Sequence, residues 1–260
     1  MTVSRLPVDP QGVYALWVRD VTRFVRTPSQ VVGALLTPLL FLVFLGTGFS
    51  GAAIPGIPEG VDYLQYIVPG IVGFTLLFGA SFAGLAILAD RDVGFLKEIL
   101  VAPVSRTSIV LGRVAGGSTT ALVQSLLILL LSVPLGFEVR RPLLAPLALV
   151  VLGLLAVTFV GFGIALASQF RDSQGFGILV QFAILPLFFL SGALYPLDQL
   201  PAAVRYLGLL NPLTYGVDAL RGVLVGTSTY PLAVDFGALV VGAVVMVAAG
   251  AALFERVEAA

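Results

Sequence analysis

The 260-residue chain contains no cysteine and no histidine. It can therefore form no disulfide and no thiolate metal site, and it lacks the commonest metal ligand and proton shuttle. Charge is also scarce, because 11% of the residues are charged and the formal net charge is zero. There is no basic surface for nucleic acid. We expect no catalytic site, no metal site and no nucleic-acid partner for this chain.

Apolar residues are abundant instead. They make up 58% of the chain, and the mean hydropathy is +1.07; soluble domains contain about 45–50% apolar residues. Several uncharged runs approach or exceed the roughly 20 residues that a helix needs to cross a bilayer, and lipid tolerates only helices or closed barrels there. These features predict an all-α integral membrane protein with a single domain over residues 1–260.

We predict six transmembrane helices in this domain, at about residues 31–49, 66–89, 114–137, 143–170, 175–194 and 232–254. The fourth is longer than the bilayer requires, so we expect it to be tilted or loosened near Gly161 and Gly163.

The basic residues predict the orientation of these helices. Lysine and arginine concentrate in the cytoplasmic loops of membrane proteins. If both termini are cytoplasmic, ten of the fourteen basic residues lie inside and four outside, and the opposite orientation inverts that ratio. We therefore expect a multi-pass protein of the plasma (inner) membrane with both termini in the cytoplasm.

The N-terminal region predicts an amphipathic helix over about residues 11–27. Between residues 13 and 25 the apolar side chains recur at helical spacing, and the arginines lie on the remaining surface. Such a helix can lie flat in the inner membrane interface, with Trp17 as its anchor. Pro28 should end it before the first span.

The loop at residues 90–106 gathers charge between two uncharged runs. Its apolar residues Phe95, Leu96, Ile99 and Leu100 share one side of a short helix, which Pro103 would terminate. One interpretation is a solvated loop that satisfies the charge bias. The other is a short helix that inserts into a groove on a soluble partner, and the four large apolar side chains favour it.

The segment at residues 195–225 is too polar and too rich in proline to span, yet too apolar for a long external loop. A pair of short helices that dip back into the outer leaflet fits it best. Asp198 or Asn211 can cap the helix that follows, with a proline near the first turn. Asp218 and Arg221 are three residues apart and can pair on one helix face.

Polar residues inside the expected spans offer a possible substrate pathway. Gln124, Thr158 and Gln181 lie in the third, fourth and fifth spans. They could line a route for substrate, or they could form contacts between helices, which are common in membrane bundles. The sequence leaves both interpretations open.

Two of these segments carry a resemblance to a known family. They are residues 91–106, and the stretch that runs from Ser191-Gly192 through Pro196 and Pro201 to Asn211-Pro212-Leu213-Thr214-Tyr215, Asp218 and Arg221. Together they resemble the ABC-2 family of ATP-binding cassette transporter permeases, most of all its drug-resistance and lipo-oligosaccharide exporter branch. The resemblance covers nearly the whole chain.

The resemblance implies an exporter in which two six-helix permease subunits, here a homodimer, meet in the membrane and two separate ATPase subunits dock below. The resemblance implies that a coupling loop contacts the ATPase. Its residues here are Arg91, Asp92, Gly94, Phe95, Lys97, Glu98 and Pro103. The N-terminal helix assists that contact. The resemblance also implies that a re-entrant helix pair forms the outer gate. Its residues here are Tyr195, Pro196, Pro201, Asn211, Pro212, Tyr215, Asp218 and Arg221.

The chain itself has no phosphate-binding loop. Its single lysine, Lys97, follows Leu96, whereas a phosphate-binding loop needs a glycine before the lysine. We therefore expect no cofactor on this chain and assign ATP and Mg to the partner subunit. The resemblance implies outward movement of an amphipathic drug, glycolipid or lipid-linked oligosaccharide across a prokaryotic plasma membrane.

Two other functions fit the sequence less well. An ion-coupled secondary transporter or channel usually keeps ionisable residues at membrane depth, whereas we expect no unpaired carboxylate or histidine inside these spans. A membrane enzyme for lipid-linked sugars would use the outer tyrosines with Asp198 or Asp218. No acid and base pair with suitable tuning is visible there.

Overall fold

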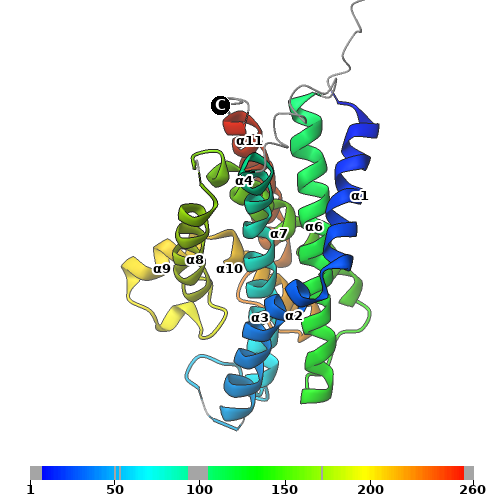
Figure 1. The fold of residues 1–260 in the computed structure, drawn as a ribbon. Helices are drawn as coiled ribbons and strands as arrows, with labels where there is room; N and C mark the ends of the chain where they lie inside the picture. Colours follow the sequence, from blue (N-terminus) through cyan, green and yellow to red (C-terminus); the bar gives the residue numbers. More distant parts are fainter. Residues whose placement is uncertain (1–7, 50, 53, 93–104, 171, 255–260) are drawn as a thin grey trace, which may run out of the picture.

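The computed structural model describes residues 8–49, 51–52, 54–92, 105–170 and 172–254. Within these ranges the chain forms helices and turns but no strand (Figure 1). The α-helices are α1 (Pro10–Arg26), α2 (Pro28–Phe41), α3 (Tyr63–Ser81), α4 (Leu85–Asp92), α6 (Arg106–Ser132), α7 (Ala145–Ala167), α8 (Ser173–Phe189), α9 (Ala202–Leu209), α10 (Pro212–Leu224) and α11 (Leu232–Phe254). A π-helix, η1 (Leu42–Thr47), and three 3₁₀ turns, η2 (Phe82–Gly84), η3 (Val133–Leu135) and η4 (Leu197–Gln199), complete the order.

Four helical segments are long and apolar enough to cross a membrane: Tyr63–Asp92, Thr107–Leu135, Ala145–Ala167 and Leu232–Phe254. A fifth candidate is the pair Pro10–Arg26 and Val31–Thr47, which is bent by 70°. The fifth predicted span corresponds to α8, an apolar helix of 17 residues that ends before the turn at Gly192, where φ is +71°. The structure therefore supports a multi-pass membrane protein with four or five candidate spans, against the six predicted.

Two predicted features of the spans need correction. The third begins at Arg106, not near residue 114, because the Ser105 side chain accepts a hydrogen bond from the Ser108 amide and caps α6. Arg113 therefore lies within α6. The fourth is not loosened near its glycines, since α7 has 23 residues and runs unbroken through Gly161 and Gly163.

These glycines serve close packing between helices. A Cβ atom on Gly163 would lie 2.3 Å from the backbone oxygen of Ser81, and one on Gly84 would lie 2.3 Å from the backbone oxygen of Gly163. Backbone thus meets backbone where α7 crosses the 3₁₀ turn η2. Small residues permit such approaches in membrane bundles.

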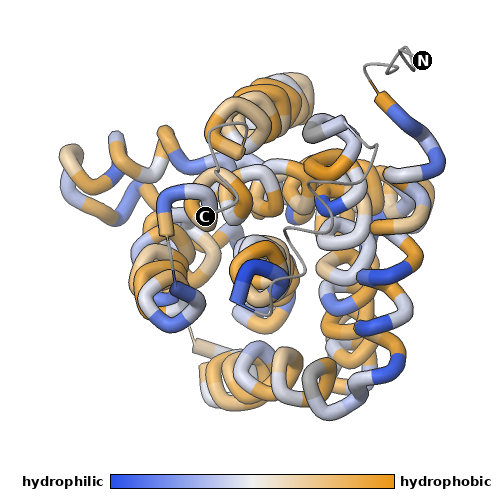
Figure 2. The backbone as a smooth tube through the Cα atoms, turned by 45° about the horizontal axis from the view of Figure 1, so that its top comes forward, coloured by the Kyte–Doolittle hydropathy of each residue, from blue (hydrophilic) through white to orange (hydrophobic). Residues whose placement is uncertain are grey.

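The centre of the bundle is formed by α3 and α7, whose side chains are mostly buried. Helix α11 packs beside α7, and α1 packs beside α6. The start of α1 and the end of α11 lie at the same end of the molecule (Figure 1). Hydrophilic residues gather along α1, whereas the other long helices are mainly hydrophobic (Figure 2).

Many large apolar side chains remain on the outside of the bundle. Phe182 of α8 is 74% exposed, and Val244 of α11 is 65% exposed. Contiguous apolar surface of this kind is rare on soluble monomers. It is the surface that a lipid environment or another membrane subunit would cover.

We predict that Gly163→Ala destabilises the fold, because the added methyl group would overlap a backbone oxygen that cannot rotate away. The free energy of unfolding in detergent should fall by about 1–3 kcal/mol, the usual cost of overpacking. Gly153→Ala is the matched control on the same helix, since a Cβ there meets no atom within 4 Å. The control should be neutral or slightly stabilising, and equal loss in both variants would contradict the backbone contact.

Candidate functional site

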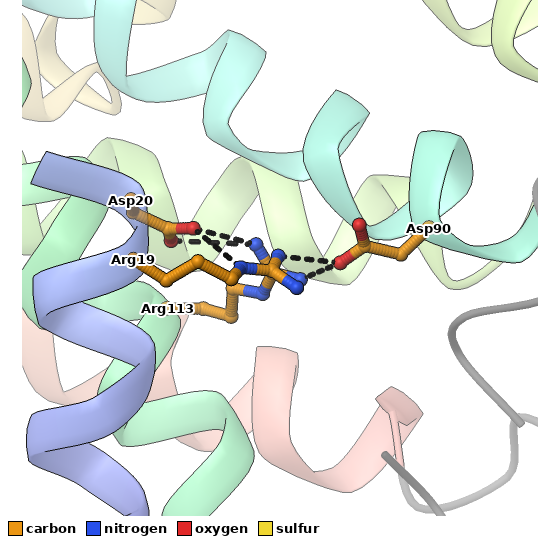
Figure 3. A network of polar contacts seen from close by, with 4 residues as sticks. All are labelled: Arg19, Asp20, Asp90 and Arg113. Atoms are coloured by element: carbon orange, nitrogen blue, oxygen red, sulfur yellow. Dashed lines mark hydrogen bonds and ion pairs between the residues drawn. The ribbon is translucent and has the colours of Figure 1, made fainter. Parts of the chain in front are cut away.

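Four charged side chains meet between α1, α4 and α6, and we call Arg19, Asp20, Asp90 and Arg113 the ionic cluster (Figure 3). Arg113 donates to Asp90 through Nη2, and to both oxygens of Asp20 through Nη1, at 3.0 and 3.3 Å. Arg19 Nη2 lies 2.7 Å from Asp90 Oδ2. The charges of the four side chains cancel, as buried ions require.

Two members of the ionic cluster, Asp90 and Arg113, are buried, whereas Arg19 and Asp20 are partly exposed. Asp90 is 7% exposed and Arg113 is 3% exposed. Asp90 precedes the end of α4 at Asp92, and Arg113 lies two turns inside α6. Because residues 93–104 connect these two helices, the Asp90–Arg113 pair ties together both ends of the predicted coupling loop.

Helix α1 is held to α6 at several points between Asp9 and Asp20. The Asp9 amide donates to Ser108 Oγ at 2.7 Å, and Trp17 Nε1 donates to Thr119 Oγ1 at 3.0 Å. Both helices run in the same direction (Figure 1). The predicted helix at residues 11–27 therefore exists as α1, and its placement in the membrane interface stays a prediction because the structure contains no membrane.

The predicted coupling residues fall partly within the described ranges. Arg91 is half-buried and Asp92 is exposed at the end of α4, where the Ser173 hydroxyl donates to the Asp92 carboxylate. This contact joins α4 to the start of α8. Gly94, Phe95, Lys97, Glu98 and Pro103 lie outside the described residues.

At the opposite end of the bundle, Arg221 of α10 binds backbone oxygens. Its Nε donates to Tyr66 O at 3.0 Å, and its Nη2 donates to Gly192 O and Ala193 O at 2.8 and 3.0 Å. The guanidinium also lies 3.6 Å from the centre of the Tyr66 ring. Tyr66 in turn donates to Gly192 O at 3.1 Å. Arg221 thereby fixes the turn after α8 against α3.

Asp218 binds a different segment. Its carboxylate accepts hydrogen bonds from the amides of Thr229 and Tyr230, at 2.9 Å each. Although both side chains are described, Asp218 and Arg221 form no ion pair with each other, so the predicted pairing is wrong. Backbone hydrogen bonds stabilise each charge instead, because carbonyl oxygens accept from the Arg221 guanidinium and amides donate to the Asp218 carboxylate.

The helix caps in the predicted outer gate agree in part with the sequence. Asn211 caps α10 by accepting from the Leu213 amide at 3.0 Å, and Pro212 occupies the first turn. Asp198 does not cap α9, because its carboxylate pairs with Arg205 at 3.1 Å on the surface. Pro201 takes the cap position of α9 without a side-chain hydrogen bond.

Tyr215 and Tyr195 complete the predicted gate residues. Tyr215 donates to Leu209 O at 2.8 Å and so ties α10 to α9, and Tyr195 is half-buried. A pocket of about 110 Å³ lies beside them, lined by Pro196, Asp198, Asp218, Arg221 and Tyr230 among others. Burial, and after it the neighbouring Tyr215, raises the pKa of Tyr230 above its ordinary value, so its phenol stays neutral.

The three predicted pathway residues occupy different environments. Thr158 is fully buried and donates to Leu154 O of its own helix at 2.7 Å. Gln181 is exposed on α8. Gln124 is 7% exposed and lines a pocket of about 400 Å³ between α1, α2, α3 and α6. The structure does not bring them together in one channel within this chain.

Asp235 corrects one expectation about the spans. It lies in the first turn of α11, is fully buried, and neither carboxylate oxygen has a hydrogen-bond partner within the described part of the chain. An unpaired carboxyl group therefore does lie inside a candidate span. Its position at a helix N-terminus is the most favourable one for an acidic side chain.

Sequence reasoning missed the ionic cluster. Nothing in the sequence distinguishes Asp20, helical spacing puts Arg19 on the polar face of the N-terminal helix, and the predicted third span begins one residue after Arg113. The available signal was the position of Asp90 and Arg113 on either side of the charged loop, close to long apolar runs. Charges at such places need partners.

The comparisons with known proteins agree with this architecture. The family model for ABC-2 type transporters matches residues 11–225. The inner membrane transport permease YadH of Escherichia coli is 30% identical over 87% of this chain and 88% of its own length. Nodulation protein J of Rhizobium meliloti is 27% identical over 98% of this chain and 97% of its own length. The putative transport permease ycf38 of Cyanophora paradoxa is 32% identical over 81% of this chain and 73% of its own length. The family model thus matches most of this apolar helical bundle, and the chain belongs to the ABC-2 type transporter family.

Proposed function

We propose that this chain is the permease subunit of an ATP-driven exporter. Two separate ABC ATPase subunits would bind and hydrolyse ATP with Mg, and two copies of this chain would form the membrane part as a homodimer. The family membership supports the transport role. The lack of a phosphate-binding loop supports an ATPase on another polypeptide.

The observation that carries this proposal is the ionic cluster. It joins α4 and α6, the two helices that flank residues 93–104, and it adds α1 to them through Asp20 and Arg19. A force applied to the loop at residues 90–106 would therefore move three helices as one unit. ATP binding can do work on that unit if the two ATPase states contact the loop differently.

The rest of the proposal follows from charge and hydropathy. The end of the bundle that carries the ionic cluster and both described chain ends would face the cytoplasm of a prokaryotic cell, following the distribution of arginine. YadH, named as an inner membrane permease, supports a plasma membrane location. We propose an amphipathic substrate that is moved outward, such as a drug, a glycolipid or a lipid-linked oligosaccharide.

We further propose that α9 and α10 form the outer gate as a helix pair that dips into the membrane. Arg221 supports this role, because it holds the turn at Gly192 and Ala193 through carbonyl oxygens. A gate of this kind would open by exchanging these hydrogen bonds for water. The pocket beside Arg221 supports this proposal, because it gives water or a polar substrate group access to these hydrogen bonds.

Asp235 favours a second candidate, an ion-coupled transporter. Proton-coupled carriers keep carboxyl groups at membrane depth, and Asp235 is buried in a candidate span without a hydrogen-bond partner among the described residues. Its place in the first turn of α11, away from the ionic cluster, favours a structural role. We therefore retain the ATP-driven exporter as the proposed function.

The first prediction from the proposed function concerns Glu98. If residues 90–106 contact the ATPase, Glu98→Arg should abolish co-purification of the ATPase subunit in mild detergent and leave membrane insertion intact. Glu59→Arg is the matched control, because Glu59 is an exposed carboxylate in the loop at the opposite end of the bundle. ATPase retained at wild-type levels by Glu98→Arg, or lost equally from both variants, would refute the docking site.

The second prediction concerns the Asp90–Arg113 pair. Asp90→Arg or Arg113→Asp alone leaves buried like charges together and should destabilise the chain by about 3–5 kcal/mol. The double exchange restores an opposite pair between positions 90 and 113 but sets like charges against Asp20 and Arg19. It should therefore recover part, not all, of the stability and of the substrate transported per ATP hydrolysed. Proteoliposomes containing both subunits provide this measurement. Recovery of stability without recovery of coupling would show that the pair is only structural.

The third prediction separates the two candidate functions. Asp235→Asn keeps the size of the side chain and removes its ability to release a proton. ATP-dependent export in proteoliposomes should therefore stay close to wild type. Transport that needs a proton gradient, and that Asp235→Asn abolishes, would instead establish the ion-coupled transporter.

A further inference from the structure

The pocket of about 400 Å³ extends from the ionic cluster toward the middle of the bundle, and we call it the α1–α6 pocket. Arg23 and Phe24 of α1 line it together with Gly33 of α2, Phe78 of α3, Phe82 of η2 and Gln124 of α6. Its size falls within the range of small-molecule sites, about 300–1,000 Å³. It lies beside the 3₁₀ break in the Tyr63–Asp92 segment, on the α1 and α2 side of the bundle.

The walls of the α1–α6 pocket are mostly apolar, and its polar lining residues are Asp20, Arg23, Thr120 and Gln124. The rings of Phe78 and Phe82 are in contact, with centres 4.8 Å apart and planes tilted by 38°. Small residues elsewhere on the wall keep the space open, and a Cβ on Gly33 would meet nothing within 4 Å. Gln124 is 93% buried, and its amide makes no hydrogen bond with any described residue. The amide atoms themselves stay accessible from the pocket, so a ligand that covers them must supply a hydrogen-bond partner.

The mouth of the α1–α6 pocket carries a net positive charge. Asp20 also lines the pocket, but its carboxylate is already engaged by Arg113 and Arg19. Because the four charges of the ionic cluster cancel, Arg23 remains as the uncompensated charge. Its side chain is exposed and pairs with no carboxylate among the described residues.

We propose that the α1–α6 pocket binds a membrane lipid with an anionic phosphate head group. The head group would contact the Arg23 guanidinium, and an acyl chain would lie against Phe24, Phe78 and Phe82. An ester oxygen or hydroxyl of the lipid would satisfy Gln124. A lipid fits this pocket because its anionic head group matches Arg23 and its acyl chain matches the apolar walls. A second copy of this chain fits less well, because its own Arg23 would bring a like charge.

The position of the pocket gives the lipid a regulatory role. Asp20 contributes both to the pocket wall and to the ionic cluster. Phe82 belongs to the turn at which the Tyr63–Asp92 segment changes helix type. A bound lipid would therefore support α1 and the 3₁₀ turn in their present positions, next to the helices that flank residues 93–104. The binding test below needs no ATPase subunit, so its result is independent of the proposed export function.

The test is native mass spectrometry on the full chain, delipidated in mild detergent and mixed with equal amounts of phosphatidylglycerol and phosphatidylcholine of the same acyl chains. Wild type should retain one phosphatidylglycerol in preference. Arg23→Gln should lower the ratio of the two bound lipids by about fivefold, the effect of one basic contact to an anionic lipid. Arg26→Gln is the matched control, since Arg26 is exposed in the same last turn of α1 but does not line the pocket.

A second pair of variants locates the lipid. Gly33→Leu fills the α1–α6 pocket without a clash at Cβ and should lower the occupancy of both lipids. Gly153→Leu, equally open at Cβ but outside the pocket, should not change it. Circular dichroism verifies that both chains are folded.

Three results would overturn the proposal. Equal effects of Arg23→Gln and Arg26→Gln would show that no head group is bound at Arg23. Unchanged occupancy in Gly33→Leu would place the lipid elsewhere. A shift from dimer to monomer in Gly33→Leu, with lipid binding unchanged, would show that a second copy of the chain covers the pocket.

Discussion

The buried ion pair between Asp90 and Arg113 sets the geometry of one whole end of the molecule. Each charge would be costly among apolar helices without the other, so α4 and α6 must stay in the register that keeps them in contact. Asp20 and Arg19 occupy the remaining positions around the pair, which fixes α1 as well. The position of the middle of α1, and of Asp20 in the wall of the adjacent pocket, depend on this requirement for neutrality.

Local signals in the sequence predicted the local features well. The predicted sixth span coincides with α11, Leu232–Phe254, because an uncharged run of that length specifies a helix by itself. Pro28 separates α1 from α2 as expected, since its ring is compatible only with the first turn of a helix. Asn211 caps α10 for the same kind of reason: the cap depends on a side chain and an amide two residues away.

Features that depend on distant partners could not be predicted in this way. The contact of Arg19 with Asp90 joins residues 71 positions apart, and that of Trp17 with Thr119 joins residues 102 apart. Spacing correctly placed Asp218 and Arg221 on one helix face, but it could not show that each faces a different turn of backbone. The need for glycine at position 163 likewise depends on contact with the Ser81 backbone, which the sequence of one span does not reveal.

The parallel course of α1 and α6 has an electrostatic consequence. Each helix carries a macrodipole with partial positive charge at its start and partial negative charge at its end. Because α1 ends beside the middle of α6, its negative pole lies against the flank of a neighbour whose dipole points the same way. Arg23 and Arg26 stand in that last turn and offset the negative pole. Because both arginines are exposed, salt screens their contact with the helix end, so the last turn of α1 should fray more readily as ionic strength rises.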